Sequence, residues 1–158
     1  MSQCHKDKKK RTIIIQGGPG TGKSVLAVNL LMEYINQSLN ASYVTKNSAP
    51  REAFLRLLTK SDAKKLVNIK QLFRSPFNLS KCDINGYDCL IVDEAHRLVK
   101  KMYGDWNGEN QVKECINASL LSIFLLDEDQ AVTTKDIGSI DEIQQRSEKL
   151  GSRLIIKD

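Results

Sequence analysis

The sequence has no long hydrophobic segment. Its uninterrupted apolar runs, such as residues 89–92, are only a few residues long, whereas a membrane-spanning helix needs about 20 apolar residues. The apolar run that follows the basic N-terminus, residues 13–15, is also too short for the core of a signal peptide. We therefore expect a cytoplasmic protein that has no membrane partner.

Residues that bind structural metals are scarce. The chain has 4 cysteines and 2 histidines, and no two cysteines show the Cys-x-x-Cys spacing typical of zinc sites. Reduced, mostly buried thiols are the ordinary state of cysteine in the cytoplasm. The sequence therefore argues against a zinc site or a disulfide framework.

The positive charge is concentrated at one end of the chain. Residues 1–11 contain five basic side chains and one acid, which gives +4 of the formal net charge of +5 and leaves +1 for the rest. A short run of like charge is usually solvated and disordered, although it can contact phosphate. We expect residues 1–11 to form a disordered basic tail and residues 12–158 to form one domain.

Short apolar segments alternate with amphipathic segments along the rest of the chain. Segments such as 89–92 are apolar on both faces, which is typical of strands inside a parallel sheet covered by helices. The pattern predicts an α/β protein with a three-layer α/β/α sandwich and a mainly parallel sheet. We expect strands at 13–15, 41–45, 89–92, 120–126 and 153–156, and helices at 22–37, 49–59, 110–118 and 140–150.

Residues 17–24 fit the P-loop pattern G-x-x-x-x-G-K-[ST]. Glycines let backbone N–H groups approach a phosphate, and the following helix presents its positive end to the anion. Lys23 would reach the β- and γ-phosphates, and Ser24 would place its hydroxyl on Mg²⁺. We predict that ATP with Mg²⁺ binds here; the alternative is a simple glycine-rich turn. The predicted phosphate-binding residues are Gly17, Gly18, Pro19, Gly20, Thr21, Gly22, Lys23 and Ser24.

Two adjacent acids, Asp93 and Glu94, follow the apolar segment 89–92. Ligands of open α/β sheets bind at the carboxyl ends of the strands, where the P-loop also lies. Asp93 is expected to hold Mg²⁺ through water, and Glu94 to orient or deprotonate the attacking water. The same pair could cap a helix beginning near Ala95, which is compatible with catalysis.

Further polar groups follow two other expected strands. Gln130 is placed to sense a γ-phosphate or the attacking water, although a glutamine after a strand is more often a surface loop residue, and residues 127–129 could equally form a solvated acidic turn. Thr45, Lys46 and Asn47 could contact a nucleic-acid backbone. From the residues alone, capping of the next helix by Asn47 or Ser48 is the favoured role.

Four segments in this order resemble the Schlafen group 3-like DNA/RNA helicase domain, a bacterial family of superfamily-one helicase type. The P-loop alone is generic, but the series is specific, and the likeness runs from about Ile13 to the C-terminus. The segments are 14–24, 43–48, 90–98 and 124–130, with 136–139 behind the last.

The resemblance implies a RecA-like P-loop NTPase core that acts on single-stranded DNA or RNA. It makes residues 17–24 motif I, 45–48 the nucleic-acid-contacting motif Ia, and 93–96 motif II. It also makes 127–130 motif III, in which Gln130 would couple the γ-phosphate to strand movement. His96 and Arg97 would help to transmit the nucleotide state.

The family also implies a second RecA-like domain that brings arginines against the γ-phosphate. This sequence ends at Asp158, about where an arginine-bearing motif would begin. Such an arginine contributes orders of magnitude to the rate in related sites. We therefore expect this chain to bind nucleotide, to hydrolyse it weakly, and to unwind nothing alone.

Other P-loop functions remain as alternatives. A GTPase needs an Asn/Thr-Lys-x-Asp motif, and Thr134-Lys135-Asp136 lacks its spacer. A P-loop kinase would carry an arginine-rich lid, and residues 127–139 contain no arginine. A nucleotide-binding module without motor activity would show tight binding and slow turnover.

Overall fold

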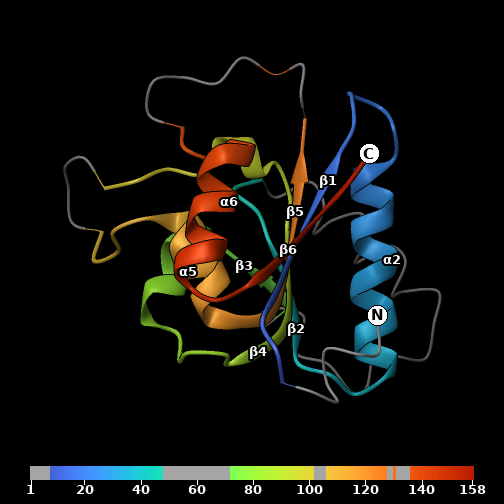
Figure 1. The fold of residues 1–158 in the computed structure, drawn as a ribbon. Coiled ribbons are helices and arrows are strands. Elements are labelled where there is room, and N and C mark those ends of the chain that lie inside the picture. The colour runs from blue at the N-terminus through green and yellow to red at the C-terminus, as the bar shows by residue number, and fades with distance from the viewer. Residues whose placement is uncertain (1–7, 48–71, 102–105, 128–129, 131–135) are drawn as a thin grey trace.

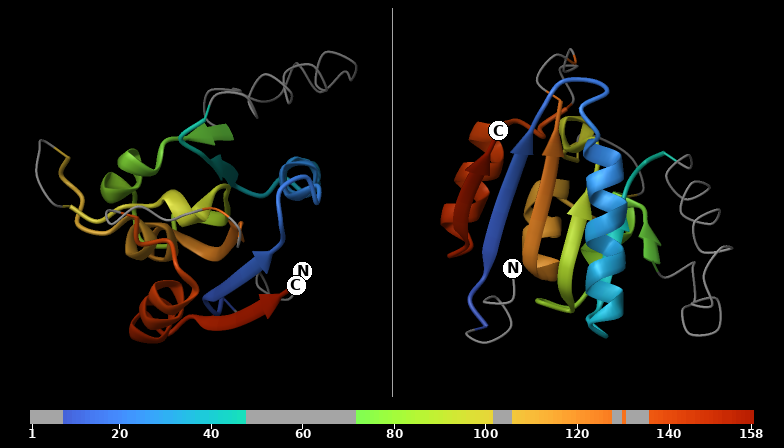
Figure 2. Two further views of the ribbon diagram at one scale, coloured as in Figure 1. Left: turned by 90° about the horizontal axis from the view of Figure 1, so that it is seen from above. Right: turned by 90° about the vertical axis from the view of Figure 1, so that its right-hand side faces the viewer.

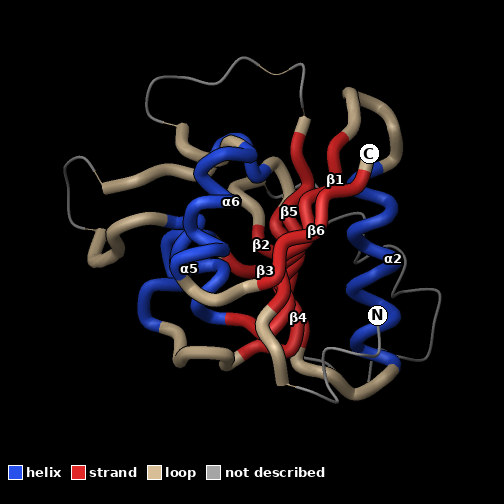
Figure 3. Tube along the Cα trace, in the orientation of Figure 1, coloured by secondary structure: helices blue, strands red, loops and turns tan. Residues whose placement is uncertain are grey.

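A computed structural model describes residues 8–47, 72–101, 106–127, 130 and 136–158. Its centre is a six-stranded sheet of order β3-β2-β4-β5-β1-β6, in which every neighbouring pair of described strands is parallel (Figures 1 and 3). In this order the strands are β3 Phe73–Arg74, β2 Ala41–Val44, β4 Tyr87–Val92, β5 Ser119–Leu126, β1 Arg11–Gln16 and β6 Arg153–Lys157.

Helices cover both faces of the sheet. Helix α2 (Lys23–Asn36) lies on one face, and α5 (Gln111–Ala118) and α6 (Ile140–Lys149) lie on the other (Figure 2). Successive residues of the central strands alternate between the two cores: Ile91 packs with α2, whereas Val92 packs with α5 and α6. The predicted three-layer sandwich with a parallel sheet is confirmed.

Three short elements had at most ambiguous signals in the sequence, where residues 66–73 suggested a short strand before Pro76 and a helix beginning near Ala95 was one alternative. They are the two-residue strand β3 and the 3-10 helices η2 (Pro76–Lys81) and η3 (Ala95–Arg97). Their apolar patterns are too short to establish a periodicity, so the packing around them decides their conformation. The expected helix at 49–59 lies outside the described residues. Within the described part, no helix is both long enough and apolar enough to cross a bilayer.

Local hydrogen bonds fix the ends of the helices on the second face. The side chain of Asn110 accepts from the backbone N–H of Lys113 at 2.9 Å, and Ser139 caps α6 through the N–H of Glu142. Helix α6 stops before Gly151, whose φ of 63° lies in the left-handed region favoured by glycine. This confirms the expected stop, and the chain turns there into β6.

The sheet begins inside the segment predicted to be a tail. Arg11 is the first residue of β1, and the Lys10 ammonium donates to the carbonyl oxygens of Ile116, Asn117 and Ser119 at 2.5–3.2 Å. These carbonyls lie at the C-terminal end of α5, where a cation is favoured by the helix dipole. The sheet thus begins one residue before the expected start of the domain, and a charge count could not show that Lys10 has partners in the fold. Residues 1–7 lie outside the described part.

Replacing Lys10 by methionine is expected to lower the free energy of unfolding by about 1–2 kcal/mol, because carbonyls at a helix end lose a cationic donor. Urea denaturation followed by circular dichroism measures this. Lys8→Met is the matched control, because Lys8 is exposed. Equal stability of the two variants would contradict the anchoring role of Lys10.

Candidate nucleotide site

The loop between β1 and α2 has the backbone of a phosphate cradle. Gly20 and Gly22 have φ values of 77° and 86°, which strain any residue with a Cβ. A Cβ on Gly17 would lie 2.8 Å from the Thr21 hydroxyl oxygen. No side chain caps the N-terminus of α2, and its first turn contains no acid. The helix therefore offers N–H groups and a positive end to an anion.

Lys23, the first residue of α2, folds back over this loop. Its ammonium donates to the carbonyl oxygens of Gly17 and Gly18 at 2.5 and 2.6 Å. The same nitrogen lies 3.9 Å from a carboxylate oxygen of Asp127, which follows β5 and is buried. The alternative that Asp127 belongs to a solvated acidic turn therefore does not hold for this residue, since its carboxylate is buried and faces the P-loop lysine.

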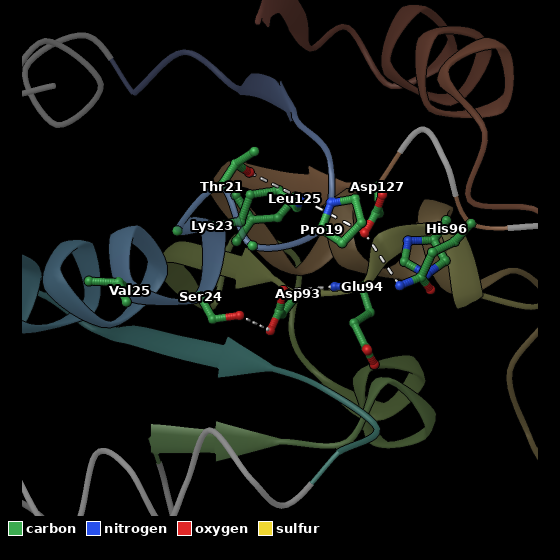
Figure 4. A pocket seen from close by; sticks show the side chains of 13 residues that line it. Pro19, Thr21, Lys23, Ser24, Val25, Asp93, Glu94, His96, Leu125 and Asp127 are labelled. Carbon is green, nitrogen blue, oxygen red and sulfur yellow. Dashed lines mark hydrogen bonds and ion pairs between the residues drawn. The ribbon is translucent and has the colours of Figure 1, made fainter.

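Ser24 and Asp93 meet across the cleft (Figure 4). The Ser24 hydroxyl donates to Asp93 Oδ2 at 3.4 Å, and the other carboxylate oxygen accepts from the backbone N–H of Glu94 at 2.9 Å. A hydroxyl and a carboxylate are hard oxygen donors of the kind that Mg²⁺ prefers. The residues present therefore fit a magnesium ion between α2 and the end of β4.

Tyr43 is a residue of this site that the sequence reasoning missed. Its phenol, on the buried strand β2, donates to Asp93 Oδ2 at 2.6 Å. Burial, and then the negative charge of Asp93, raise the pKa of Tyr43 far above its ordinary value, so it stays a donor and orients the carboxylate. The available signal was a tyrosine in a buried strand, because its hydroxyl needs a partner there.

Glu94 is held in an unusual backbone conformation, with a φ of 48°. Its carboxylate forms an ion pair with the Arg97 guanidinium at 3.4 Å, and Figure 4 shows its side chain turned away from that of Asp93. No side-chain bond caps η3. The acidic pair therefore does not cap this turn through its side chains, as the alternative had it.

Two further side chains reach the same cleft from beyond β4 and β5. Gln130 is exposed and donates from its amide to Asp127 Oδ2 at 3.3 Å. His96 is buried in η3, and neither of its ring nitrogens has a hydrogen-bond partner among the described residues. A buried imidazole without partners is costly in a folded protein, which is consistent with a site that meets a polar ligand.

The segment 136–139 supports the turn that carries His96. The N–H of Ile137 donates to the Leu98 carbonyl oxygen at 2.7 Å. A Cβ on Gly138 would lie 1.6 Å from the carbonyl oxygen of Ala95, so only glycine permits this approach. Gly138 is a second residue whose structural role the sequence reasoning did not identify.

The P-loop, the acidic pair, His96 and the residues after β5 line one cleft of about 450 Å³ at the carboxyl edge of the sheet (Figure 4). The structure thus brings together the P-loop, the acidic pair and Gln130, as the sequence predicted for the carboxyl ends of parallel strands. The cleft is lined by Pro19, Gly20, Thr21, Gly22, Lys23, Ser24, Val25, Asp93, Glu94, His96, Leu125, Asp127 and Gln130.

The predicted nucleic-acid residues do not line this cleft. Thr45 and Lys46 line a smaller cleft next to it, which shares Asp93 and Glu94 with the first. The Thr45 side chain accepts from the backbone N–H of Asn47 at 3.0 Å, while the Lys46 ammonium donates to the carbonyl oxygen of Arg97. Glu94 therefore lies between the nucleotide cleft and the residues predicted to contact nucleic acid.

Residues 10–156 match the family model described as Schlafen group 3, DNA/RNA helicase domain. No curated protein matches the sequence.

Two solved structures share the fold. The flagellar accessory protein FlaH from Methanocaldococcus jannaschii has a TM-score of 0.53 and 18% identity, over 92% of this chain and 70% of that one. The Hef helicase domain from Pyrococcus furiosus has a TM-score of 0.53 and 14% identity, over 98% of this chain and 36% of that one. This chain thus spans little more than a third of the Hef chain. At these identities the likeness shows the fold alone.

Proposed function

The chain belongs to the Schlafen group 3 DNA/RNA helicase domain family, and from this premise we propose that its cleft binds ATP with Mg²⁺ and hydrolyses the ATP. The proposal rests on one observation: the Lys23 ammonium, the Ser24–Asp93 pair and Glu94 all line the same cleft at the end of a parallel sheet. An NTPase needs this combination of a phosphate cradle, metal ligands and a base.

Phosphate binding falls to the loop and to Lys23. The glycine backbone at residues 20 and 22 leaves room for a phosphate close to the N–H groups that start α2. Lys23 would exchange its contacts with the Gly17 and Gly18 carbonyl oxygens for the β- and γ-phosphates. Asp127 lies close enough to hold the ammonium in this part of the cleft.

Ser24 and Asp93 are the residues that would hold Mg²⁺. When bound, the ion neutralises charge on the β- and γ-phosphates. Tyr43 and the Glu94 N–H occupy both carboxylate oxygens of Asp93 through hydrogen bonds, so the carboxylate is oriented before any ligand binds. Asp93 is therefore better suited to contact the ion through water than to enclose it.

Glu94 would take the proton of the attacking water. Its side chain is only partly buried and pairs with an exposed arginine, so rotation toward the cleft breaks a single surface ion pair. Such a pair contributes about 0–1 kcal/mol, which is small beside the barrier of the chemical step. Gln130 lies at the same end of the cleft and would position the water or sense the γ-phosphate.

We further propose that the domain is part of a helicase-like protein that acts on DNA or RNA, and that a second RecA-like domain closes the other side of the cleft. The family description supports a nucleic-acid partner. Coverage of 36% of the Hef helicase domain is compatible with one half of a two-domain motor. Hydrolysis by residues 1–158 without that domain should be slow, because an arginine from across the cleft contributes orders of magnitude to the rate in related sites.

Nucleotide titration and phosphate release test this function. The chain should bind Mg·ATP by calorimetry and release phosphate slowly, and single-stranded DNA or RNA should change that rate. A clear preference for GTP, or transfer of the phosphate to a metabolite in place of water, would overturn the proposal. Binding without any turnover would instead support a nucleotide-binding module.

A further inference from the structure

Four side chains form an exposed aromatic and basic surface beside the smaller cleft. The members of this stacking surface are Lys46, Phe77, Arg97 and Trp106. They come from the end of β2, from η2, from η3 and from the loop before α5. The nucleotide cleft does not include any of them, so the surface is a separate feature of the same edge of the sheet.

The aromatic half of the surface is rigid. The rings of Phe77 and Trp106 meet edge to face, with centroids 5.5 Å apart and an interplanar angle of 84°. The indole N–H donates to the carbonyl oxygen of Phe77 at 3.1 Å. A Cβ on Gly108 would lie 2.2 Å from the indole, so glycine at this position lets the ring lie against the backbone. Both rings are thus held in place before any partner binds.

The Phe77 side chain is nevertheless open to solvent, with 43% of its surface exposed. Aromatic side chains are enriched at binding surfaces, where an exposed ring offers apolar area to a partner. A cation lies close to this ring, since the Lys46 ammonium is 5.5 Å from the Phe77 ring centroid. Arg97 adds a guanidinium whose side chain is 56% exposed.

We propose that this surface binds single-stranded nucleic acid, with a base stacked on Phe77 and the backbone phosphates at Lys46 and Arg97. The inference rests on the proposed function and names the residues that carry its nucleic-acid partner. Aromatic rings provide stacking for any unpaired base, and cations track the phosphates. A duplex keeps its bases stacked on one another and cannot use the ring in this way.

The surface also lies where it could influence the nucleotide site. Lys46 donates to the backbone carbonyl of Arg97, and the Arg97 side chain pairs with Glu94. A phosphate bound by the Arg97 guanidinium competes with the Glu94 carboxylate for the same cation. Binding of a strand would therefore loosen Glu94 from its ion pair.

Trp106 serves as the fluorescent probe of binding, because it is the only tryptophan of the chain. Titration with oligothymidylate or oligouridylate should change its emission. Phe77→Leu should weaken binding of both oligomers about tenfold, because a stacked base contributes roughly 1–3 kcal/mol. Phe77→Tyr, which keeps the ring, should bind as the wild type does. Ile84→Ala is the control, since Ile84 is exposed but lies outside the surface.

An abasic oligomer of the same length separates stacking from charge. Phe77→Leu should bind it as tightly as the wild type, whereas Lys46→Met should weaken both ligands and lower the salt dependence by about one phosphate contact. Unchanged oligothymidylate affinity in Phe77→Leu, or equal binding of a duplex, overturns the inference. ATP affinity of each variant is measured in parallel, so a failure of nucleotide binding is seen separately. Intact ATP affinity also shows that the variants are folded.

Discussion

Replacing Glu94 by glutamine is expected to lower the rate of ATP hydrolysis by about 100-fold or more while leaving ATP affinity within about twofold. Glutamine has nearly the same size and shape, but its amide cannot accept the proton of the attacking water. Asp93, Ser24 and Lys23 would still hold the phosphates and the metal. Single-turnover phosphate release, together with calorimetric titration of Mg·ATP, separates the chemical step from binding.

Glu94 also pairs with Arg97, so the test must separate the chemical role of the carboxylate from a structural one. Loss of the 3.4 Å contact with Arg97 changes stability little, since both side chains are partly exposed. A fall in rate therefore cannot be attributed to unfolding. Glu148→Gln is the matched control, because Glu148 is an exposed acid on α6. Turnover in Glu94→Gln at the wild-type rate would show that this carboxylate is not the base.

Replacing Lys23 by alanine is expected to weaken Mg·ATP binding about 100-fold. The Lys23 side chain is 14% exposed, and its ammonium lies between two backbone carbonyls and Asp127. Hydrogen bonds from a cation to an anionic group in such a place contribute about 1.5–3 kcal/mol. The variant would also leave Asp127 buried without the neighbouring cation, which adds to the repulsion of phosphate. Calorimetric titration of the variant measures the loss of affinity.

Lys149→Ala is the control for the loss of one positive charge, because Lys149 is exposed on α6 and lies outside the cleft. Lys23→Arg keeps the charge but changes the donor geometry, and it should recover only part of the affinity. If Lys23→Ala binds Mg·ATP as tightly as the control does, the phosphates do not lie at the P-loop. The proposed function would then need a different site.

Much of the fold could be predicted because its signals are local or periodic. Segments 89–92 and 120–126 are apolar on both faces, which only the inside of a covered parallel sheet accommodates. Gly151 marks the end of α6 because its left-handed conformation needs no partner elsewhere in the chain. The family expected from the order of the motifs is confirmed as well.

The misplaced or missed features depend on contacts between distant parts of the chain. In the sequence, Lys10 is one residue of a basic run. Only its hydrogen bonds to carbonyl oxygens more than a hundred residues later in the chain show that it belongs to the fold. Tyr43 contributes to the site because β2 pairs with β4, which brings its phenol to Asp93. Neither contact leaves a periodic signal in the sequence.

The stacking surface shows this dependence on distant contacts most clearly. Trp106 and Phe77 both lie outside the strands and helices that were expected from the sequence. The ring of Trp106 contacts Phe77, which lies almost thirty residues earlier in the chain. No rule of local sequence could have paired the two rings.

By itself the sequence determined the phosphate loop, the adjacent acids and the alternation of strands and helices, because glycine conformation, charge and hydrophobic period are properties of neighbouring residues. Only the tertiary structure decided that Tyr43 orients Asp93 and that Phe77 meets Trp106. Both facts depend on strand order and on the packing of η2, which bring together side chains that no short-range pattern connects.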